Sequence, residues 1–244
     1  MNRSALAGSN LLRRSHSWGE SMTLTAPFSK VAVIDDAPNM REELAYRIKE
    51  QSLEPVLISG PFKSIDDLIA EILGSAQFAL CDLQIKPIIN ASGSEVVARL
   101  TERRFPSILF SQRVDTGIAE FRDILDRIPA FLTRDELDQK DLRNEYADIS
   151  ASLLAEAPEK RAYPTILRVE AVHSDGRVDF IIPGWSPSEI IEMSRRKMPA
   201  KVADAIAVGS HVFASVNLGA RSQEMLYIKN LELAEEPDDD DGLA

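Results

Sequence analysis

Polar side chains follow four short apolar runs of this chain, and their types suit phosphoryl chemistry. The runs, with the polar residues after them, are Val31–Ile34 with Asp35 and Asp36, Gln77–Cys81 with Asp82, Ser107–Phe110 with Ser111, and Ala130–Thr133 with Arg134. If the three carboxylates meet, two like charges ~4 Å apart cost on the order of 4 kcal/mol at an effective dielectric of 20. A divalent cation relieves this repulsion, and oxygen ligands are those that magnesium prefers. A metal ion beside a carboxylate also suits in-line transfer of a phosphoryl group to that carboxylate.

Alternating strand and helix patterns would bring these side chains together. A further apolar run, Pro55–Ser59, predicts one more strand. The helices between the strands are marked by apolar residues at helical spacing: Met40, Leu44 and Ile48; Ile65, Leu68, Ile69 and Ile72; Val96, Val97 and Leu100; Ile118, Phe121 and Leu125; and Leu142, Tyr146, Ile149 and Leu153. Continuous apolar strands between amphipathic helices imply a parallel sheet covered on both faces. We therefore predict a doubly wound α/β domain with a five-stranded parallel sheet, in which ligands bind at the carboxyl ends of the strands.

Four motifs in order carry a resemblance to a known family. VAVIDD (31–36), ALCDLQ (79–84), ILFS (108–111) and FLTR (131–134) resemble the signatures of response-regulator receiver domains, over about residues 30–156. The resemblance implies a flavodoxin-like fold that accepts a phosphoryl group from a histidine kinase or a histidine phosphotransfer protein. Such a receiver promotes its own aspartyl phosphorylation and has no independent enzyme activity.

The resemblance also assigns roles to individual residues. Asp82 would be the phosphoacceptor and a Mg²⁺ ligand, with Asp35, Asp36 and the backbone carbonyl of Gln84 completing the protein ligands. Ser111 matches the hydroxyl that bonds the phosphoryl group, and Phe131 matches the aromatic switch position. For Ser111, a helix-capping hydroxyl is the alternative.

The chain departs from the family's pattern in two places. Arg134 stands where the family has a lysine that pairs with the phosphoryl group, and arginine keeps the charge but changes the geometry. An ion pair of Arg134 with Asp135 or Glu136 is the alternative to a phosphate contact. The loop after Asp82 is longer than usual, and Lys86 within it could supply a second cation.

The second half of the chain has a different pattern, with strands that do not alternate with long helices. Strand patterns at Thr165–Val172, Arg177–Ile182, His211–Asn217 and Met225–Leu231 predict a small, mostly β domain over residues 165–233, resembling a partly open barrel. Ser186 and Pro187 predict the start of a short helix. We expect residues 1–28 to be disordered, 29–156 to form the receiver, 157–164 to be a linker, and 234–244 to be a disordered acidic tail.

The charge and composition of the chain indicate which classes of partner to expect. The net charge is −11, so the overall field does not steer the protein to nucleic acid, although a local basic patch could still bind it. In the second half of the chain, Arg195–Lys197 is the only compact basic cluster. A solvated helix end is the other reading of that cluster. No apolar run approaches the ~20 residues of a membrane span, and we expect no membrane partner. A single cysteine, Cys81, suits the cytoplasm. The apolar spacing of 142–153 fits helix packing on the sheet or, alternatively, the seam of a homodimer.

Three functions therefore remain open. The first is a signalling or phosphorelay protein phosphorylated on Asp82, whose β domain provides output to an unknown protein partner, because that domain lacks a three-helix pattern with a basic recognition helix. The second is a pseudo-receiver scaffold that is never phosphorylated. The third is a regulator whose β domain binds single-stranded nucleic acid.

Overall fold

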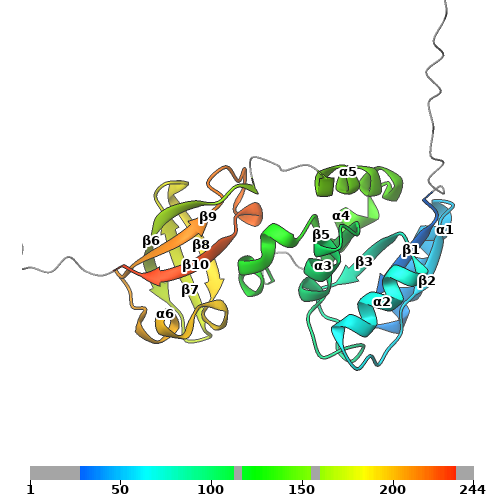
Figure 1. The fold of residues 1–244 in the computed structure, drawn as a ribbon, viewed down its shortest axis with the longest axis horizontal. Coiled ribbons are helices and arrows are strands. Elements are labelled where there is room, and N and C mark those ends of the chain that lie inside the picture. The colour runs from blue at the N-terminus through cyan, green and yellow to red at the C-terminus, as the bar shows by residue number, and fades with distance from the viewer. Residues whose placement is uncertain (1–27, 113–116, 155–159, 235–244) are drawn as a thin grey trace, which may run out of the picture.

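The computed structural model describes residues 28–112, 117–154 and 160–234. The predictions of disorder for 1–28 and 234–244 lie outside these ranges apart from Phe28 and Ala234. Phe28 is ordered against the first domain, because its ring stacks on that of Tyr146 at 4.3 Å between centroids. Two units are visible, a parallel α/β unit and a β unit (Figure 1).

The first unit is a five-stranded parallel sheet with the order β2-β1-β3-β4-β5. Its strands are β1 (Lys30–Ile34), β2 (Glu54–Leu57), β3 (Phe78–Asp82), β4 (Ser107–Ser111) and β5 (Phe131–Thr133). Its α-helices are α1 (Pro38–Glu50), α2 (Ile65–Ser75), α3 (Gly93–Glu102), α4 (Arg134–Asp138) and α5 (Leu142–Leu154). This strand order is that of the flavodoxin-like doubly wound fold, so the predicted fold is confirmed.

Alternation along the strands divides the core between the two faces of the sheet. In β1, Val31 and Val33 pack with apolar residues of α1, α4 and α5, whereas Ala32 and Ile34 pack with those of α2 and α3. The apolar side of α5 belongs to the first of these cores, with Leu142 and Ile149 buried. The structure therefore agrees with helix packing for 142–153.

The connection from β4 to β5 corrects one prediction. Instead of an α-helix marked by Ile118, Phe121 and Leu125, the chain forms two 3₁₀ segments, η1 (Ile118–Glu120) and η2 (Arg122–Arg127). Buried residues recur here at a spacing of three, as at Ile118, Phe121 and Ile124, and a 3₁₀ helix places residues three apart on one side. The sequence pattern allowed either helix type.

The second unit, called the β domain below, is a five-stranded antiparallel sheet with the order β10-β9-β6-β7-β8. Its strands are β6 (Tyr163–Val172), β7 (Arg177–Ile182), β8 (Ser186–Ser194), β9 (His211–Val216) and β10 (Ile228–Leu233). Short helices η4 (Arg195–Lys197), α6 (Ala200–Ala205) and η5 (Gln223–Met225) connect them. β6 begins two residues before its predicted start, within the segment predicted to be a linker.

The helix predicted at Ser186 is wrong, because these residues begin the strand β8. β8 pairs only with β7 and so lies at an edge of the sheet, where the missing N–H of Pro187 is tolerated. Ile191 and Met193 of this strand enter the β-domain core, which fixes its register. Trp185 packs against the same core, and its Nε1–H donates to the carbonyl of Ala220 at 2.8 Å.

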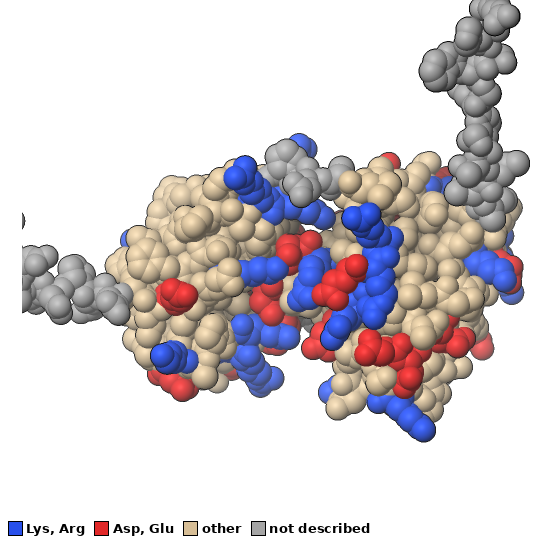
Figure 2. All heavy atoms as spheres, in the orientation of Figure 1, with Lys and Arg blue, Asp and Glu red and all other residues tan. Residues whose placement is uncertain are grey.

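The two units are held together by η1 and η2, which lie between the parallel sheet and the β domain (Figure 1). Arg122 is 4% exposed and its guanidinium donates to the backbone carbonyls of Glu192 (2.7 Å), Gln223 (2.8 Å) and Leu226 (2.6 Å), all in the β domain. A second contact joins Lys229 to Asp126 at 2.6 Å. Charged side chains of both signs gather where the units face each other (Figure 2).

Candidate functional site

A cavity of about 260 Å³ lies at the carboxyl edge of the parallel sheet. It is lined by Asp35, Asp36, Ala37, Met40, Asp82, Gln84, Ser111, Gln112 and Arg134. All six residues that were predicted to form the site are in this set. They come from four separate segments of the chain, and the parallel strands bring these segments to one edge.

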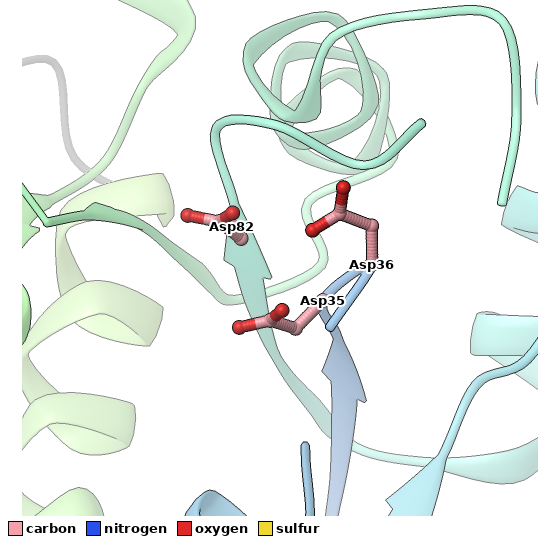
Figure 3. A group of neighbouring side chains, drawn as sticks. All are labelled: Asp35, Asp36 and Asp82. Atoms are coloured by element: carbon pink, nitrogen blue, oxygen red, sulfur yellow. The ribbon is translucent and has the colours of Figure 1, made fainter. Parts of the chain in front are cut away.

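The three carboxylates lie close enough to share one ion. Oxygen atoms of Asp35, Asp36 and Asp82 are all within 4.8 Å of one another, at the ends of β1 and β3 (Figure 3). Magnesium binds oxygen at ~2.1 Å, so two of its ligands can be about 4 Å apart. The donor set and its spacing therefore fit Mg²⁺, and a small contraction would complete the contact.

Arg134 neutralises one of the three acids. Its Nη2–H donates to Oδ2 of Asp35 at 2.8 Å, and both side chains are largely buried. The other carboxylate oxygen, Oδ1, accepts the backbone N–H of Ala37 at 2.9 Å. The predicted alternative of an ion pair with Asp135 or Glu136 is therefore wrong for Arg134. Since α4 begins at Arg134, the end of β5 directs the guanidinium into the cavity rather than along the helix.

Asp82 is the carboxylate with the most perturbed acidity. Burial, followed by the charge of Asp35, raises its pKa to about 7, although the backbone amides of Leu83 and Gln84 and the charge of Arg134 act in the opposite direction. The pocket thus holds more negative charge than its protein cations compensate. A divalent cation would lower this pKa and keep Asp82 ionised.

The backbone around Asp82 leaves no space for a side chain at Gly93. A Cβ atom there would lie 1.8 Å from the carbonyl oxygen of Asp82. The helix α3 begins at this glycine, with Ser92 and Glu95 forming a reciprocal capping box. Gln84 is bridged to Ser92 in the same loop, so the start of α3 fixes the segment that carries the predicted carbonyl ligand.

The two predicted switch positions occupy neighbouring strands. Ser111 ends β4 and lines the cavity, opposite Thr133 in the register of β5. Phe131, also in β5, makes an edge-to-face contact with Phe121 at 5.2 Å between ring centroids. Since Phe121 precedes Arg122, the aromatic pair connects the sheet to the segment that holds the β domain. The switching roles of both residues stay predictions.

Lys86 lies beside the site and does not line the acidic cavity. It borders an adjoining cavity that shares Asp36 and Gln84 with it. Its proposed role as a second cation remains a prediction.

Sequence reasoning missed Arg122 entirely, because its acceptors are backbone carbonyls 70 to 104 residues away. It also missed Arg41, whose guanidinium donates to the backbone carbonyl of Asp35. The only sequence signal for Arg122 was its place between the apolar residues Phe121 and Ile124. No helix in the described ranges is long and apolar enough to cross a membrane.

Comparison with known proteins gives structural matches only. No family model matches the chain, and no curated protein matches it. Among solved structures, it is similar to a response regulator receiver domain protein from Clostridium thermocellum, with 16% identity, a TM-score of 0.40, and coverage of 52% of this chain and 100% of that one. The response regulator TrrA from Thermotoga maritima, solved with Mg²⁺-BeF, has 19% identity, a TM-score of 0.36, and coverage of 48% and 99%. A Francisella response regulator receiver domain has 13% identity, a TM-score of 0.39, and coverage of 51% and 98%.

Proposed function

We propose that this chain is a two-component signalling protein that accepts a phosphoryl group on Asp82 from a histidine kinase or a histidine phosphotransfer protein. The observation that carries the proposal is the single cavity in which Asp35, Asp36 and Asp82 share space for one ion. Three acids converge there, and Arg134 forms an ion pair with one of them, Asp35. Perturbed carboxylates in a cavity are a mark of function.

The reaction would be a displacement at phosphorus. A carboxylate oxygen of Asp82 attacks the phosphorus of a phosphohistidine, the new P–O bond forms as the P–N bond breaks, and the leaving imidazole takes up a proton from solvent. Asp35, Asp36, Asp82 and the carbonyl of Gln84 would hold Mg²⁺, which supplies charge neutralisation for the phosphoryl oxygens. Ser111, which lines the cavity, would donate its hydroxyl hydrogen to one of these oxygens.

We assign output to the β domain, through a protein partner or as a phosphate relay or sink in the cytoplasm. Within residues 160–234, the longest helix of the β domain is α6 with six residues, which is short for a helix that reads the major groove. Single-stranded nucleic acid is a weaker alternative, because the chain carries a net charge of −11.

The second candidate function is a pseudo-receiver scaffold. The ion pair of Arg134 with Asp35 favours it, because the cation in the lysine position is already engaged. In that case the chain binds its partners without phosphorylation.

Treatment with acetyl phosphate and Mg²⁺, followed by intact-mass measurement, separates the two candidates. We expect wild type to gain about 80 Da, the mass of one phosphoryl group, and Asp82→Asn to gain nothing. Omission of Mg²⁺ is the matched control and should abolish the gain. No gain in the wild type with Mg²⁺ present would reject phosphorylation and favour the scaffold.

A further inference from the structure

A second cavity adjoins the acidic site and is bordered by both units. Its volume is about 640 Å³. It is lined by Asp36, Leu83, Gln84, Ile85, Lys86, Asn90, Ala91, Ser92, Glu95, Glu120 and Arg196. Every one of these residues except Arg196 belongs to the first unit, the parallel α/β unit, which is called the receiver unit below. Asp36 and Gln84 also line the acidic cavity. The β domain therefore contributes one side chain, that of Arg196, to a cavity that shares Asp36 and Gln84 with the acidic cavity around Asp82.

Arg196 is uncommitted, unlike its neighbours in η4. Arg195 donates from Nε to the carbonyl of Ala203 at 2.6 Å, and the charge of Lys197 acts on Asp123 of η2. Arg196 is exposed and, within the described parts of the chain, makes no hydrogen bond or ion pair. A flexible arginine without a partner, beside a pocket of carboxylates, can turn toward a new anion with little loss of existing contacts.

The position of Arg196 is set by the contact between the two units. The three hydrogen bonds of Arg122 hold β8, η5 and Leu226, which follows η5, against η2. The strand β8 leads directly into η4, so the same contact holds Arg196 at the cavity. Separation of the β domain would remove Arg196 from the site.

An aspartyl phosphate needs cations that the receiver unit alone supplies poorly. Phosphorylation replaces the single negative charge of the Asp82 carboxylate with the roughly −2 charge of a phosphoryl group, and Arg134 is engaged with Asp35. Arginine binds phosphate oxygens through two parallel N–H groups, which an exposed and uncommitted guanidinium can offer. We propose that Arg196 binds the phosphoryl group on Asp82, so that the β domain is the intramolecular reader of phosphorylation. This inference rests on the proposed phosphorylation of Asp82.

The test uses BeF₃⁻ with Mg²⁺ as a mimic of the phosphoryl group, titrated into the full chain by calorimetry. We expect Arg196→Ala to weaken BeF₃⁻ binding by about three- to tenfold, the range for one partly solvated charge contact. Arg122→Gln should weaken binding by a similar factor, because it releases the β domain. The double variant should bind no more weakly than Arg122→Gln alone.

Matched variants distinguish this inference from its alternatives. Arg221→Ala removes an exposed arginine of the β domain that does not border this cavity, and should change binding by less than about twofold. If the wild type and Arg196→Ala bind BeF₃⁻ equally, the reader role is rejected while phosphorylation stands. If Lys86→Ala weakens binding and Arg196→Ala does not, the extra cation comes from the receiver unit and the inference is also rejected. If the wild type binds no BeF₃⁻, both the proposed function and the inference fail.

Discussion

The acidic cavity and the contact made by Arg122 solve the same electrostatic problem in opposite ways. In the cavity, three carboxylates converge and one cation, Arg134, compensates one of them. At the contact, one buried cation faces three backbone carbonyls, and Glu224 and Glu192 add favourable charge. Burial lowers the pKa of Arg122 to about 10, so its guanidinium stays charged at neutral pH.

This difference separates a site that can bind a ligand from a contact that only joins the two units. Arg122 donates to three backbone carbonyls of the β domain and is 4% exposed, so a ligand would have to displace existing bonds. The cavity has carboxylate oxygens without a neutralising partner, and a cation or a phosphoryl group with its cation would complete them. A buried charge whose hydrogen bonds are all made, like that of Arg122, stabilises the structure. Carboxylates without a neutralising cation, like those of the acidic cavity, can bind a ligand of opposite charge.

The largest expected effect comes from removing the paired charge. Arg122→Gln should destabilise the contact between the units by about 2 to 4 kcal/mol, because buried carbonyls lose charge-assisted hydrogen bonds. Small-angle scattering should show a larger radius of gyration, and hydrogen exchange should rise in η5 and at the start of β10. Arg127→Gln, in the same 3₁₀ segment, breaks a more exposed ion pair with Glu102 and should change stability by less than about 1 kcal/mol. Equal losses of stability in the two variants would show that the burial of Arg122 does not make its contact stronger than that of Arg127.

The two regions also differ in how far the sequence predicts them. Asp35, Asp36 and Asp82 follow apolar runs, and parallel strands place such ends at one edge, so the cavity could be predicted without coordinates. The engagement of Arg134 with Asp35 could not, because the choice between acids at positions 35, 135 and 136 depends on the direction in which α4 leaves β5. No side-chain pattern encodes the partners of Arg122, since all three are carbonyls.

The same reasoning explains the two mistaken elements. A segment buried on two sides, as η1 and η2 are, carries apolar residues whose spacing does not separate a 3₁₀ from an α-helix. Ser186 and Pro187 are good helix-starting residues, yet the pairing of β8 with β7 overrides that local preference. Long-range contacts decide both cases, and no local pattern reports them.

The second prediction concerns a substitution that removes excess negative charge from the acidic cavity. It should stabilise the protein, whereas Arg122→Gln should destabilise it. With the pKa of Asp82 near 7 in the folded chain and ~4 when unfolded, the folded state binds more protons across this window. Stability in the absence of metal should therefore fall as pH rises from about 4 to 7, and the full cost remains above pH 7. Asp82→Asn should then stabilise the metal-free protein at pH 8 by about 1 to 2 kcal/mol, after allowance for solvent screening of the carboxylate.

Thermal unfolding in a chelator at pH 4 and pH 8 checks this sign. The advantage of Asp82→Asn should vanish at pH 4, and added Mg²⁺ should reduce it at pH 8 by stabilising the folded wild type. Asp36→Asn is an informative companion, because it removes another acid of the same cavity without removing the phosphoacceptor. A metal-free wild type that is more stable than Asp82→Asn at pH 8 would contradict the excess of charge in the cavity.

The smallest expected effect comes from the ion pair of Lys229 with Asp126, which tests whether the strength of a contact between the units depends on burial or on short distance. Lys229 and Asp126 are 2.6 Å apart, as close as the contacts of Arg122, but their side chains are 30% and 25% exposed. Solvent competes for such a pair and salt screens it, so Lys229→Met should cost no more than about 1 kcal/mol. A double-mutant cycle with Asp126→Asn in low and high salt measures the coupling directly, and the coupling should shrink as salt rises. A coupling as large as the loss in Arg122→Gln, and insensitive to salt, would mean that short distance alone fixes the strength of the contact. Burial would then not explain why the contact of Arg122 is stronger than the partly exposed pair of Lys229 and Asp126.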